Sequence, residues 1–488
     1  MNLAKLISEI KNSEEKNIKD IEITGISYNS KTTKAGDIFV CLVGENSDGH
    51  NFAKMAIDNG AVALMVEKFL DFDVPQIKVS STRHQIAELA ASFYNHPSKN
   101  INMIGVTGTN GKTTVTHLIQ KIFEANNQNC GIIGTLGFKL KSTDSYAEAK
   151  HTTPQAPEFQ AVLRNALNKG ITDIATEVSS HSLEQNRVGG TIFNTAVLTN
   201  LTQDHLDYHI TMNNYFEAKA ILFKNLKEGS FAVINIDDEY ANRFVSVIPK
   251  GVNVVTYGIK NDADFKAENI EFSMSGAKYT LNFDNNKKEI CLQLNGMFSV
   301  YNTLAAIATA KVNNIPIDVI VKVLEETKGV AGRFEAVNTS PLVIVDYAHT
   351  PDGLENVLKA ANELKGEKSR LICLFGCGGD RDATKRPKMG KIADENSDII
   401  VVTSDNPRSE NPALIISDIM AGIQTVNPKR VYVEQDRGKA IELLKKISLP
   451  DDIIVVAGKG HEDYQILKDK TIHFDDREEV RKVFGKEE

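Results

Sequence analysis

The stretch that most constrains the fold is INMIGVTGTNGKTT, residues 101–114. A short apolar run ends there in a loop with two glycines, and the polar-to-apolar pattern KTTVTHLIQKIFEAN follows at once. Five apolar residues of that pattern recur at the spacing of one helix face: Val115, Leu118, Ile119, Ile122 and Phe123. A strand, a glycine loop, Lys-Thr-Thr and a helix in this order predict a cradle for phosphate.

Each part of this cradle has a chemical task. Gly108 and Gly111 let the backbone approach phosphate oxygens, and the free N–H groups at a helix N-terminus favour anions. Lys112 adds a positive charge, and the hydroxyl of Thr113 is suited to hold Mg²⁺. The strict P-loop pattern fails, because Val106 stands where its first glycine would be. We still expect phosphate binding, because the strand, the glycines and Lys-Thr-Thr occur together.

Length and composition limit the classes of protein. A chain of 488 residues is long enough for several domains, each with its own core. The net charge of -8 argues against a nucleic-acid partner, and no apolar stretch reaches the roughly 20 residues of a membrane span. The first residues lack the apolar core of a signal peptide. Five scattered cysteines form no disulfide or metal pattern, so we expect reduced thiols and a cytoplasmic protein.

Apolar runs that alternate with helical patterns predict an α/β protein of three domains. Residues 1–98 form a small α/β unit, and a polar stretch with a proline follows as a linker. Residues 99–332 carry the phosphate loop on a parallel sheet, and alternating segments between 254 and 294 predict a small antiparallel appendage. Residues 333–488 form a second, Rossmann-like unit, in which polar loops follow predicted strands, as ligand sites of open parallel sheets do.

The central unit holds several candidate metal ligands. Glu177 ends a predicted strand, where the second Mg²⁺ ligand of a nucleotide site often lies, although a capping or surface glutamate would give the same pattern. The segment DHLDYH predicts either a divalent-ion site or a polar loop, and its candidates are Asp204, His205, Asp207 and His209. Lys219 lies in a helix-like stretch, where an ammonium that reaches solvent is the simpler interpretation.

Two loops of the last unit suggest an amino-acid pocket. In DNPR, a proline-stiffened turn presents Arg408, whose guanidinium is suited to bind a carboxylate through two hydrogen bonds. In GKGHEDYQ, Glu462 is an acceptor for an ammonium group. Together the two side chains suit the head of a zwitterionic amino acid. An Arg–Glu ion pair on a solvated rim explains the same two residues equally well.

The ordered set of motifs is more specific than any one of them. The chain contains, in this order, GTNGKTT, TTP, EVSSHSLEQNRV, TNLTQDHLDYH, EAKAILF, GMFSVYN, GVAGRFE, VDYAHTPDG, GGDRD, DNPR and GKGHEDYQ. In these motifs it resembles the Mur ligases of bacterial cell-wall synthesis, and most closely those that add diaminopimelate. The resemblance covers nearly the whole chain and is strongest from about residue 105 onward.

The resemblance implies that the three domains bind the UDP end of a nucleotide substrate, ATP, and the incoming amino acid. ATP would phosphorylate the D-Glu carboxylate of UDP-N-acetylmuramoyl-L-alanyl-D-glutamate to an acyl phosphate. The amino group of meso-2,6-diaminopimelate would then attack, and phosphate would leave. Such a protein is an ATP- and Mg²⁺-dependent carbon–nitrogen ligase of cytoplasmic peptidoglycan-precursor synthesis, expected as a monomer without membrane or nucleic-acid partners.

The resemblance also implies roles for single residues. The ATP site would comprise Gly108, Thr109, Asn110, Gly111, Lys112, Thr113, Thr114, Asn302, Arg333 and Asp346. The Mg²⁺ ligands would be Thr113, Glu177, His205 and Lys219, the last as a carbamate (N6-carboxylysine). The nucleotide-dipeptide contacts would be Ser30, Asp48, His50, Thr152, Thr153, Ser179, Gln185 and Arg187. The diaminopimelate contacts would be Arg381, Asp405, Asn406, Pro407, Arg408, Gly458 and Glu462. The catalytic residues would be Lys112, Glu177, His205, Lys219 and His349.

Two departures and three alternatives accompany this resemblance. Ser299 stands where the family usually has Asn, and YNSK at residues 28–31 is a loose form of the uridine-side motif. A lysine-adding ligase and a folylpolyglutamate synthetase are the nearest alternatives, and DNPR and GKGHEDYQ speak against both. Lysine lacks the second carboxylate that Arg408 would bind. A nucleotide-dependent switch belongs to another class, and it would not need the polar loops of the last unit.

Overall fold

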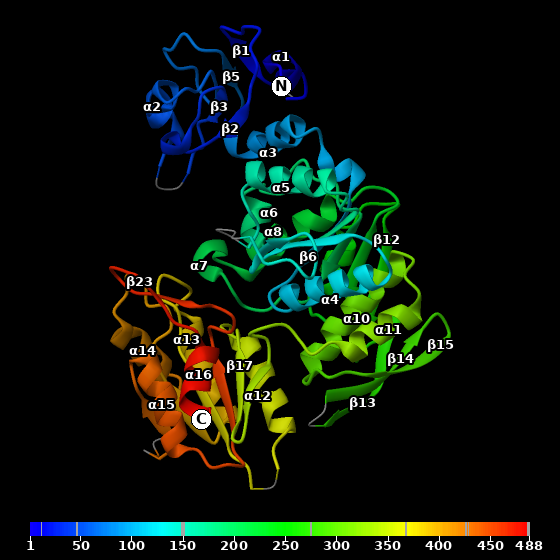
Figure 1. Cartoon of the computed structure of the whole chain (residues 1–488), viewed down its shortest axis with the longest axis vertical. Helices are drawn as coiled ribbons and strands as arrows, with labels where there is room; N and C mark the ends of the chain where they lie inside the picture. The colour runs from blue at the N-terminus through cyan, green and yellow to red at the C-terminus, as the bar shows by residue number, and fades with distance from the viewer. Residues whose placement is uncertain are drawn as a thin grey trace.

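The computed structural model describes residues 1–488 except 11, 45–46, 148–151, 274–275, 367, 425–426, 428 and 486–488. Three large sheets follow one another along the chain, one within each of the predicted units, called here the N-terminal (1–98), central (99–332) and C-terminal (333–488) units. Figure 1 shows the N-terminal unit at one end, with the C-terminal unit beside α7 (Leu206–His209) of the central unit. None of the described helices is both long and apolar enough to cross a membrane.

The N-terminal sheet has five strands, of which one edge strand runs antiparallel to its neighbour. In spatial order they are β1 (Glu14–Lys16), β5 (Gln76–Lys78), β4 (Ala63–Val66), β3 (Asp37–Val40) and β2 (Gly25–Ser27). The helices of this unit are α1 (Leu3–Ser8), α2 (Ala53–Asp58) and α3 (Thr82–Phe93). β1 has the polar sequence EEK, because an edge strand needs no apolar face on the solvent side.

The central sheet has ten strands, and β6, which precedes the phosphate loop, lies inside it. In spatial order they are β15 (Asn286–Cys291), β14 (Gly276–Phe283), β13 (Phe265–Ser273), β12 (Asn253–Gly258), β11 (Phe231–Asn235), β10 (Thr195–Leu198), β6 (Asn102–Thr107), β9 (Asp173–Glu177), β7 (Cys130–Gly134) and β8 (Gly137–Lys139). The predicted antiparallel appendage is formed by β13, β14 and β15. It continues the central sheet, because β13 pairs in parallel with the end of β12.

Helices cover both faces of the central sheet. One core lies under α4 (Lys112–Ala125), α10 (Met297–Val312) and α11 (Ile317–Glu326), and the five apolar residues that predicted α4 are all buried in it. The opposite core lies under α5 (Ala156–Asn168), α8 (Met212–Lys224) and α9 (Ala241–Ser246). Ile104 and Val106 of β6 face the first core and Met103 faces the second, as the alternation of side chains along a strand requires.

The C-terminal sheet has six strands, five parallel and one antiparallel at the edge. In spatial order they are β16 (Glu335–Thr339), β17 (Leu342–Asp346), β21 (Ile453–Ala457), β18 (Leu371–Phe375), β19 (Ile399–Val402) and β20 (Val431–Val433). Its helices are α12 (Pro351–Glu363), α13 (Lys385–Asn396), α14 (Pro412–Met420), α15 (Arg437–Ile447) and α16 (Asp476–Phe484), and a hairpin of β22 (Tyr464–Ile466) and β23 (Thr471–His473) completes the unit. The strand order reverses at β21, so the loops after β17, β18, β19 and β21 converge at one edge.

Candidate active site

The phosphate loop joins β6 to α4 and is shaped by its glycines. Gly108 and Gly111 have φ angles of +149° and +88°, where side chains with a Cβ are strained. A Cβ on Gly111 would lie 2.4 Å from Oδ1 of Asn302, and one on Gly108 would lie 1.8 Å from Oγ1 of Thr199. Gly111 also caps α4 without a side chain, so no side-chain cap occupies the first N–H groups of the helix. The loop therefore has the form that a phosphate cradle requires.

Lys112 and the buried Lys219 converge on the carbonyl groups of this loop. Lys112 Nζ donates to the carbonyl oxygens of Gly108 (2.9 Å) and Thr109 (2.8 Å). Lys219 Nζ, from α8, donates to the same Gly108 oxygen at 2.8 Å, and its side chain is almost fully buried. Burial, aided by the nearby Lys112 charge, lowers the pKa of Lys219 well below its usual value. The simpler interpretation of Lys219, an ammonium that reaches solvent, does not hold.

Thr113, Glu177 and Thr135 form an oxygen-rich cluster beside the loop. Thr113 Oγ1 donates to Glu177 Oε1 at 3.0 Å, and Thr135 donates to the same carboxylate through its backbone N–H (2.9 Å) and its hydroxyl (3.0 Å). Glu177 is buried, and these direct partners are neutral. A buried carboxylate next to a hydroxyl fits Mg²⁺, which takes hard oxygen ligands and few of them from protein. Among the described residues, no three His, Cys, Asp or Glu side chains gather into a metal site by themselves.

A cleft of about 610 Å³ opens beside the phosphate loop. It is lined by these residues of the predicted ATP site: Asn110, Gly111, Thr114, Asn302, Arg333 and Asp346. Arg333 links the cleft to the loop, because its Nη2 donates to Thr113 Oγ1 at 3.2 Å and its guanidinium stacks 4.4 Å from the ring centre of Tyr347. Asp346 accepts from the backbone N–H groups of Phe334 and Ala348, both at 2.7 Å. Burial raises the pKa of Asp346, and Arg333 opposes that rise.

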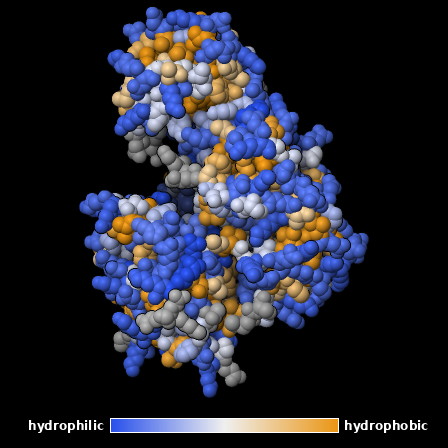
Figure 2. Space-filling view, in the orientation of Figure 1, coloured by the Kyte–Doolittle hydropathy of each residue, from blue (hydrophilic) through white to orange (hydrophobic). Residues whose placement is uncertain are grey.

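A second cleft, of about 820 Å³, lies between the central and C-terminal units. From the central unit it is lined by Thr152, Thr153, Ser179, Arg187 and His205 of the predicted set. From the C-terminal unit it is lined by His349, Arg381, Asp405, Asn406, Arg408, Gly458 and Glu462. Figure 2 shows a recess where the C-terminal unit meets the rest of the molecule, with hydrophilic residues around it. The residues predicted for the dipeptide and for the amino acid therefore face one shared space.

On the amino-acid side of this cleft, Arg408 donates hydrogen bonds to neutral backbone carbonyl groups. Arg408 Nη1 donates to the carbonyl oxygens of Gly379 (2.8 Å) and Asn406 (3.4 Å). The ion pairs of the described residues do not join Arg408 to Glu462, so the rim ion pair considered from the sequence is not formed. Glu462 Oε2 instead accepts from Lys459 Nζ at 3.1 Å and from Asn406 Nδ2 at 3.0 Å. The fully buried Lys459 belongs to a quoted motif, but its pairing was not foreseen.

The dipeptide side is organised around Arg187. Its Nη1 donates to the Thr153 carbonyl at 3.1 Å, and its Nε and Nη2 donate to Gln185 Oε1 at 3.1 and 2.7 Å. Gln185 also donates from Nε2 to the hydroxyl of Tyr208 at 3.2 Å. Ser179 caps α6 (Ser180–Glu184) by accepting from the N–H of Ser182. Gln185 therefore orients Arg187, which lines the cleft, whereas Gln185 itself and the predicted Pro407 are not among the residues that line it.

The structure does not bring the predicted uridine-side residues to either cleft. His50 is buried and pairs its Nδ1 with Asp48 Oδ1 at 2.5 Å, while its Nε2 accepts from the N–H of Glu67 at 2.9 Å. Asp48 caps the short 3-10 helix η2 (Gly49–Phe52). Ser30 is buried at the start of η1 (Ser30–Thr32). Asp48 and His50 thus satisfy each other within the N-terminal unit, and their contact with substrate stays a prediction.

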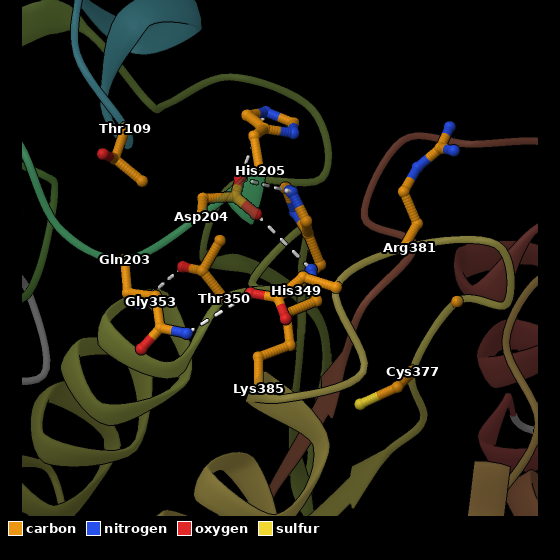
Figure 3. A network of polar contacts seen from close by, with 12 residues as sticks. Thr109, Gln203, Asp204, His205, His349, Thr350, Gly353, Cys377, Arg381 and Lys385 are labelled. Carbon is orange, nitrogen blue, oxygen red and sulfur yellow. Dashed lines mark hydrogen bonds and ion pairs between the residues drawn. The ribbon is translucent and has the colours of Figure 1, made fainter. Parts of the chain in front are cut away.

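Asp204 lines the second cleft and lies close to three further polar side chains. Asp204 is buried, and its Oδ2 lies 3.3 Å from His205 Nε2 and 3.8 Å from His349 Nε2, while its Oδ1 lies 3.5 Å from Lys385 Nζ (Figure 3). Burial alone would raise the pKa of Asp204, but these three neighbours hold it well below its usual range. Burial lowers the pKa of His205 to about 3 and that of His349 to about 4, so both imidazoles are neutral at pH 7.

Sequence reasoning did not foresee two members of this cluster. His181 stacks edge-on against His205 with ring centres 4.8 Å apart, and burial lowers its pKa to about 4. Lys385 is the first residue of α13 and lines the cleft. A lysine at a helix N-terminus is a detectable signal, because acidic residues are favoured there.

Comparison with known proteins follows the same division of the chain. Residues 22–94 match the family described as Mur ligase family, catalytic domain. Residues 106–310 match the Mur ligase middle domain, and residues 332–460 match the Mur ligase glutamate ligase domain.

Whole-length relatives are also found. The UDP-N-acetylmuramoyl-L-alanyl-D-glutamate–2,6-diaminopimelate ligase of Clostridium botulinum is 45% identical over 99% of both chains. The protein of that name from Listeria monocytogenes serotype 4b is 44% identical over 94% of both. A solved structure of that name is 33% identical, with a TM-score of 0.67 over 94% of each chain. MurF of Acinetobacter baumannii, 20% identical with a TM-score of 0.67 over 93% of this chain and 94% of its own, shares the fold.

Proposed function

Because the chain belongs to the Mur ligase family, we propose that it joins meso-diaminopimelate to the D-glutamate of UDP-N-acetylmuramoyl-L-alanyl-D-glutamate in an ATP-dependent reaction. The observation that carries this proposal is the shared second cleft. Thr153 and Arg187 line one wall, Asn406 and Arg408 line the other, and His205 and His349 lie in the same cleft. An activated carboxylate held on the first wall would meet an amino group held on the second.

The reaction proceeds in two stages. A D-Glu carboxylate oxygen attacks the γ-phosphorus of ATP, ADP leaves, and an acyl phosphate forms. The diaminopimelate amino group then attacks the acyl carbon, loses a proton, and expels inorganic phosphate as the amide forms. A carboxylate alone is a poor acyl donor, so phosphorylation supplies the leaving group. The protein's main tasks are to position the reactants and to neutralise charge.

The phosphate loop and Arg333 serve the first stage. The N–H groups at the start of α4 and the ammonium of Lys112 would bind the phosphates of ATP. Arg333 lies between the ATP cleft and Thr113, so it is placed to contact phosphate oxygens from the C-terminal side. Thr113 and Glu177 would hold Mg²⁺, which neutralises phosphate charge when bound. His205 and a carbamate on Lys219 would add further ligands.

The amine of Lys219 has the environment that carbamate formation needs. Only an uncharged amine attacks carbon dioxide, and burial beside Lys112 favours that form. On forming the carbamate, the uncharged amine would lose a proton and gain a negative charge beside the Lys112 ammonium. Lys219 would thereby become an oxygen ligand beside the phosphates.

Arg408 supplies the basis for choosing diaminopimelate over lysine. Its donors meet the neutral carbonyls of Gly379 and Asn406, so its charge is available to the second carboxylate of the substrate. Lysine lacks that carboxylate and would leave the guanidinium without an anionic partner. Sites built for such a group discriminate by roughly 10⁴-fold.

We further propose that the protein is cytoplasmic and acts as a monomer. All five cysteines are free, which fits a reducing cytoplasm. The N-terminal unit would hold the UDP end of the substrate, the central unit ATP, and the C-terminal unit the amino acid.

The test is phosphate release from ATP and Mg²⁺ with UDP-N-acetylmuramoyl-L-alanyl-D-glutamate, comparing meso-diaminopimelate, L-lysine and no amino acid. We expect release that depends on diaminopimelate and is negligible with lysine. Equal release with lysine would contradict the specificity, and release that ignores both amino acids would contradict the ligase.

A further inference from the structure

Asp204 belongs to the central unit, yet part of its polar surroundings comes from the C-terminal unit. It lies on the loop between β10 and α7, while Lys385 begins α13 and His349 follows β17. The exposed fractions of the Asp204 and Lys385 side chains are 6% and 7%. An ion pair between two separate units is thus almost excluded from water.

Lys385 occupies an unfavourable position for a cation. The N-terminus of a helix carries a partial positive charge, so an ammonium on the first residue of α13 is repelled. Removing an ammonium from water is costly unless an anion compensates. Among the ion pairs of the described residues, Lys385 is joined to Asp204. The free-energy cost of burying the Lys385 ammonium at the start of α13 is therefore offset only when the loop that carries Asp204 is docked against this helix.

Hydrogen bonds from side-chain amides of the central unit flank this ion pair and give the contact a defined geometry. Gln203 Nε2 donates to Asp382 Oδ2 at 3.3 Å and to Thr384 Oγ1 at 3.1 Å, both just before α13. Farther along the boundary, Asn110 of the phosphate loop donates from Nδ2 to Asp352 Oδ2 at 2.8 Å. Figure 3 shows Asp204 between the imidazole of His205 and two side chains of the C-terminal unit, His349 and Lys385.

We propose that Lys385 is a positioning residue, whose pair with Asp204 holds the C-terminal unit where its amino-acid residues face the dipeptide residues of the central unit across the second cleft. The proposal rests on the proposed ligase function. Arg381 precedes Lys385 on the same segment and lines the same cleft, as Arg408 does. Without the pair, ATP would still bind its own loop, but the bound amino acid would reach the acyl phosphate less often. The loss would therefore fall on kcat more than on nucleotide affinity.

Kinetics of four variants test this role: Lys385→Met, Lys385→Arg, Asp204→Asn and the double variant Asp204→Asn/Lys385→Met. We expect Lys385→Met to lower kcat about 10- to 100-fold, with the Kd for ATP within about twofold of wild type. Lys385→Arg keeps the charge and should recover most of the rate. The double variant should be no slower than the slower single variant, because both changes remove one interaction. Lys391→Met, an exposed lysine of the same helix, is the matched control.

A distance measurement reports positioning without requiring turnover. Cys291 is the exposed cysteine of the central unit, and the other four cysteines are buried, so Cys291 and an added Lys446→Cys on α15 accept a pair of spin labels. In the presence of ATP, the Lys385→Met distance distribution should be broader or longer than that of wild type and of Lys385→Arg. If wild type showed no ligase turnover but the distances still differed between wild type and Lys385→Met, the proposed ligase function would be wrong. The positioning role of Lys385 would then still be supported. An unchanged distribution and kcat in Lys385→Met, or multiplicative effects in the double variant, would overturn the proposal.

Discussion

The Nζ atom of Lys219 lies 2.8 Å from the carbonyl oxygen of Gly108, the same oxygen to which Lys112 donates. Two amines thus share one acceptor in the phosphate loop, one from the start of α4 and the buried one of Lys219 from α8. Like charges at such a site repel, which lowers the pKa of Lys219 further after burial has lowered it. The arrangement favours an uncharged Lys219 and hence its conversion to a carbamate.

Lys219→Ala should be nearly inactive, and added acetate or formate should restore part of the activity, because a small carboxylate can occupy the place of the carbamate. Phosphate release with and without the added carboxylate measures this effect. Lys224→Ala, an exposed lysine at the end of the same helix, serves as the control and should keep full activity. Full activity of Lys219→Ala in plain buffer would rule out the carbamate.

Arg408→Ala should raise KM for diaminopimelate and lower kcat/KM about 100-fold or more, because truncation leaves a substrate carboxylate without its partner. KM for ATP should stay close to that of wild type, since Arg408 lines only the second of the two clefts. Steady-state kinetics with each substrate varied in turn separate the two constants. Arg481→Ala, on the exposed face of α16, is the control. An unchanged KM for diaminopimelate contradicts this role of Arg408.

His117 predicts a defined loss of stability in acid. It is buried on α4, its Nδ1 donates to the Thr113 carbonyl at 2.6 Å, and burial lowers its pKa to about 4. The unfolded chain, with a histidine pKa near 6.5, binds the extra proton first, so this contribution to stability is present above about pH 6.5 and falls as pH drops toward 4. Relative to His117→Gln, wild type should lose up to about 1.4 kcal/mol per pH unit across that window. If wild type and His117→Gln differed in unfolding free energy by the same amount at pH 7 and at pH 5, the lowered pKa of His117 would be contradicted.

Ile210 carries backbone strain directly after the end of α7. Its φ is +69°, rare for a β-branched residue, and its side chain is 75% exposed, so packing compensates little. Ile210→Gly should stabilise the protein by about 1 kcal/mol, after the greater freedom of glycine in the unfolded state is subtracted. Ile210→Ala keeps the Cβ and should gain less. Thermal unfolding of wild type, Ile210→Gly and Ile210→Ala measures these differences in stability. Equal unfolding midpoints would show that the backbone at Ile210 stores no strain.

Features encoded within short segments were predictable, and those that depend on pairing between units were not. The phosphate loop and the apolar face of α4 follow from local spacing, and the structure has both. The antiparallel strands near the end of the central sheet were also expected, but their union with it rests on the short pairing of β13 with β12. Nothing in local sequence marks that register.

The Asp204–Lys385 pair shows the limit most clearly. The two residues are far apart in the chain, and their contact exists only because the C-terminal unit docks on the loop before α7. The pairing of Lys459 with Glu462 was easier to predict from the sequence, because the two residues are three apart on one loop. Its effect is that one oxygen of the predicted ammonium acceptor already contacts an ammonium of the protein.

In the proposed reaction, a D-Glu carboxylate is activated as an acyl phosphate and then captured by diaminopimelate. The decisive experiment uses nucleotide-dipeptide substrate labelled with ¹⁸O in that carboxylate, followed by mass spectrometry of the released phosphate. Phosphate release should depend on diaminopimelate, and the released phosphate should carry one ¹⁸O atom from the carboxylate. Unlabelled phosphate, released whether or not diaminopimelate is present, would contradict the proposed reaction.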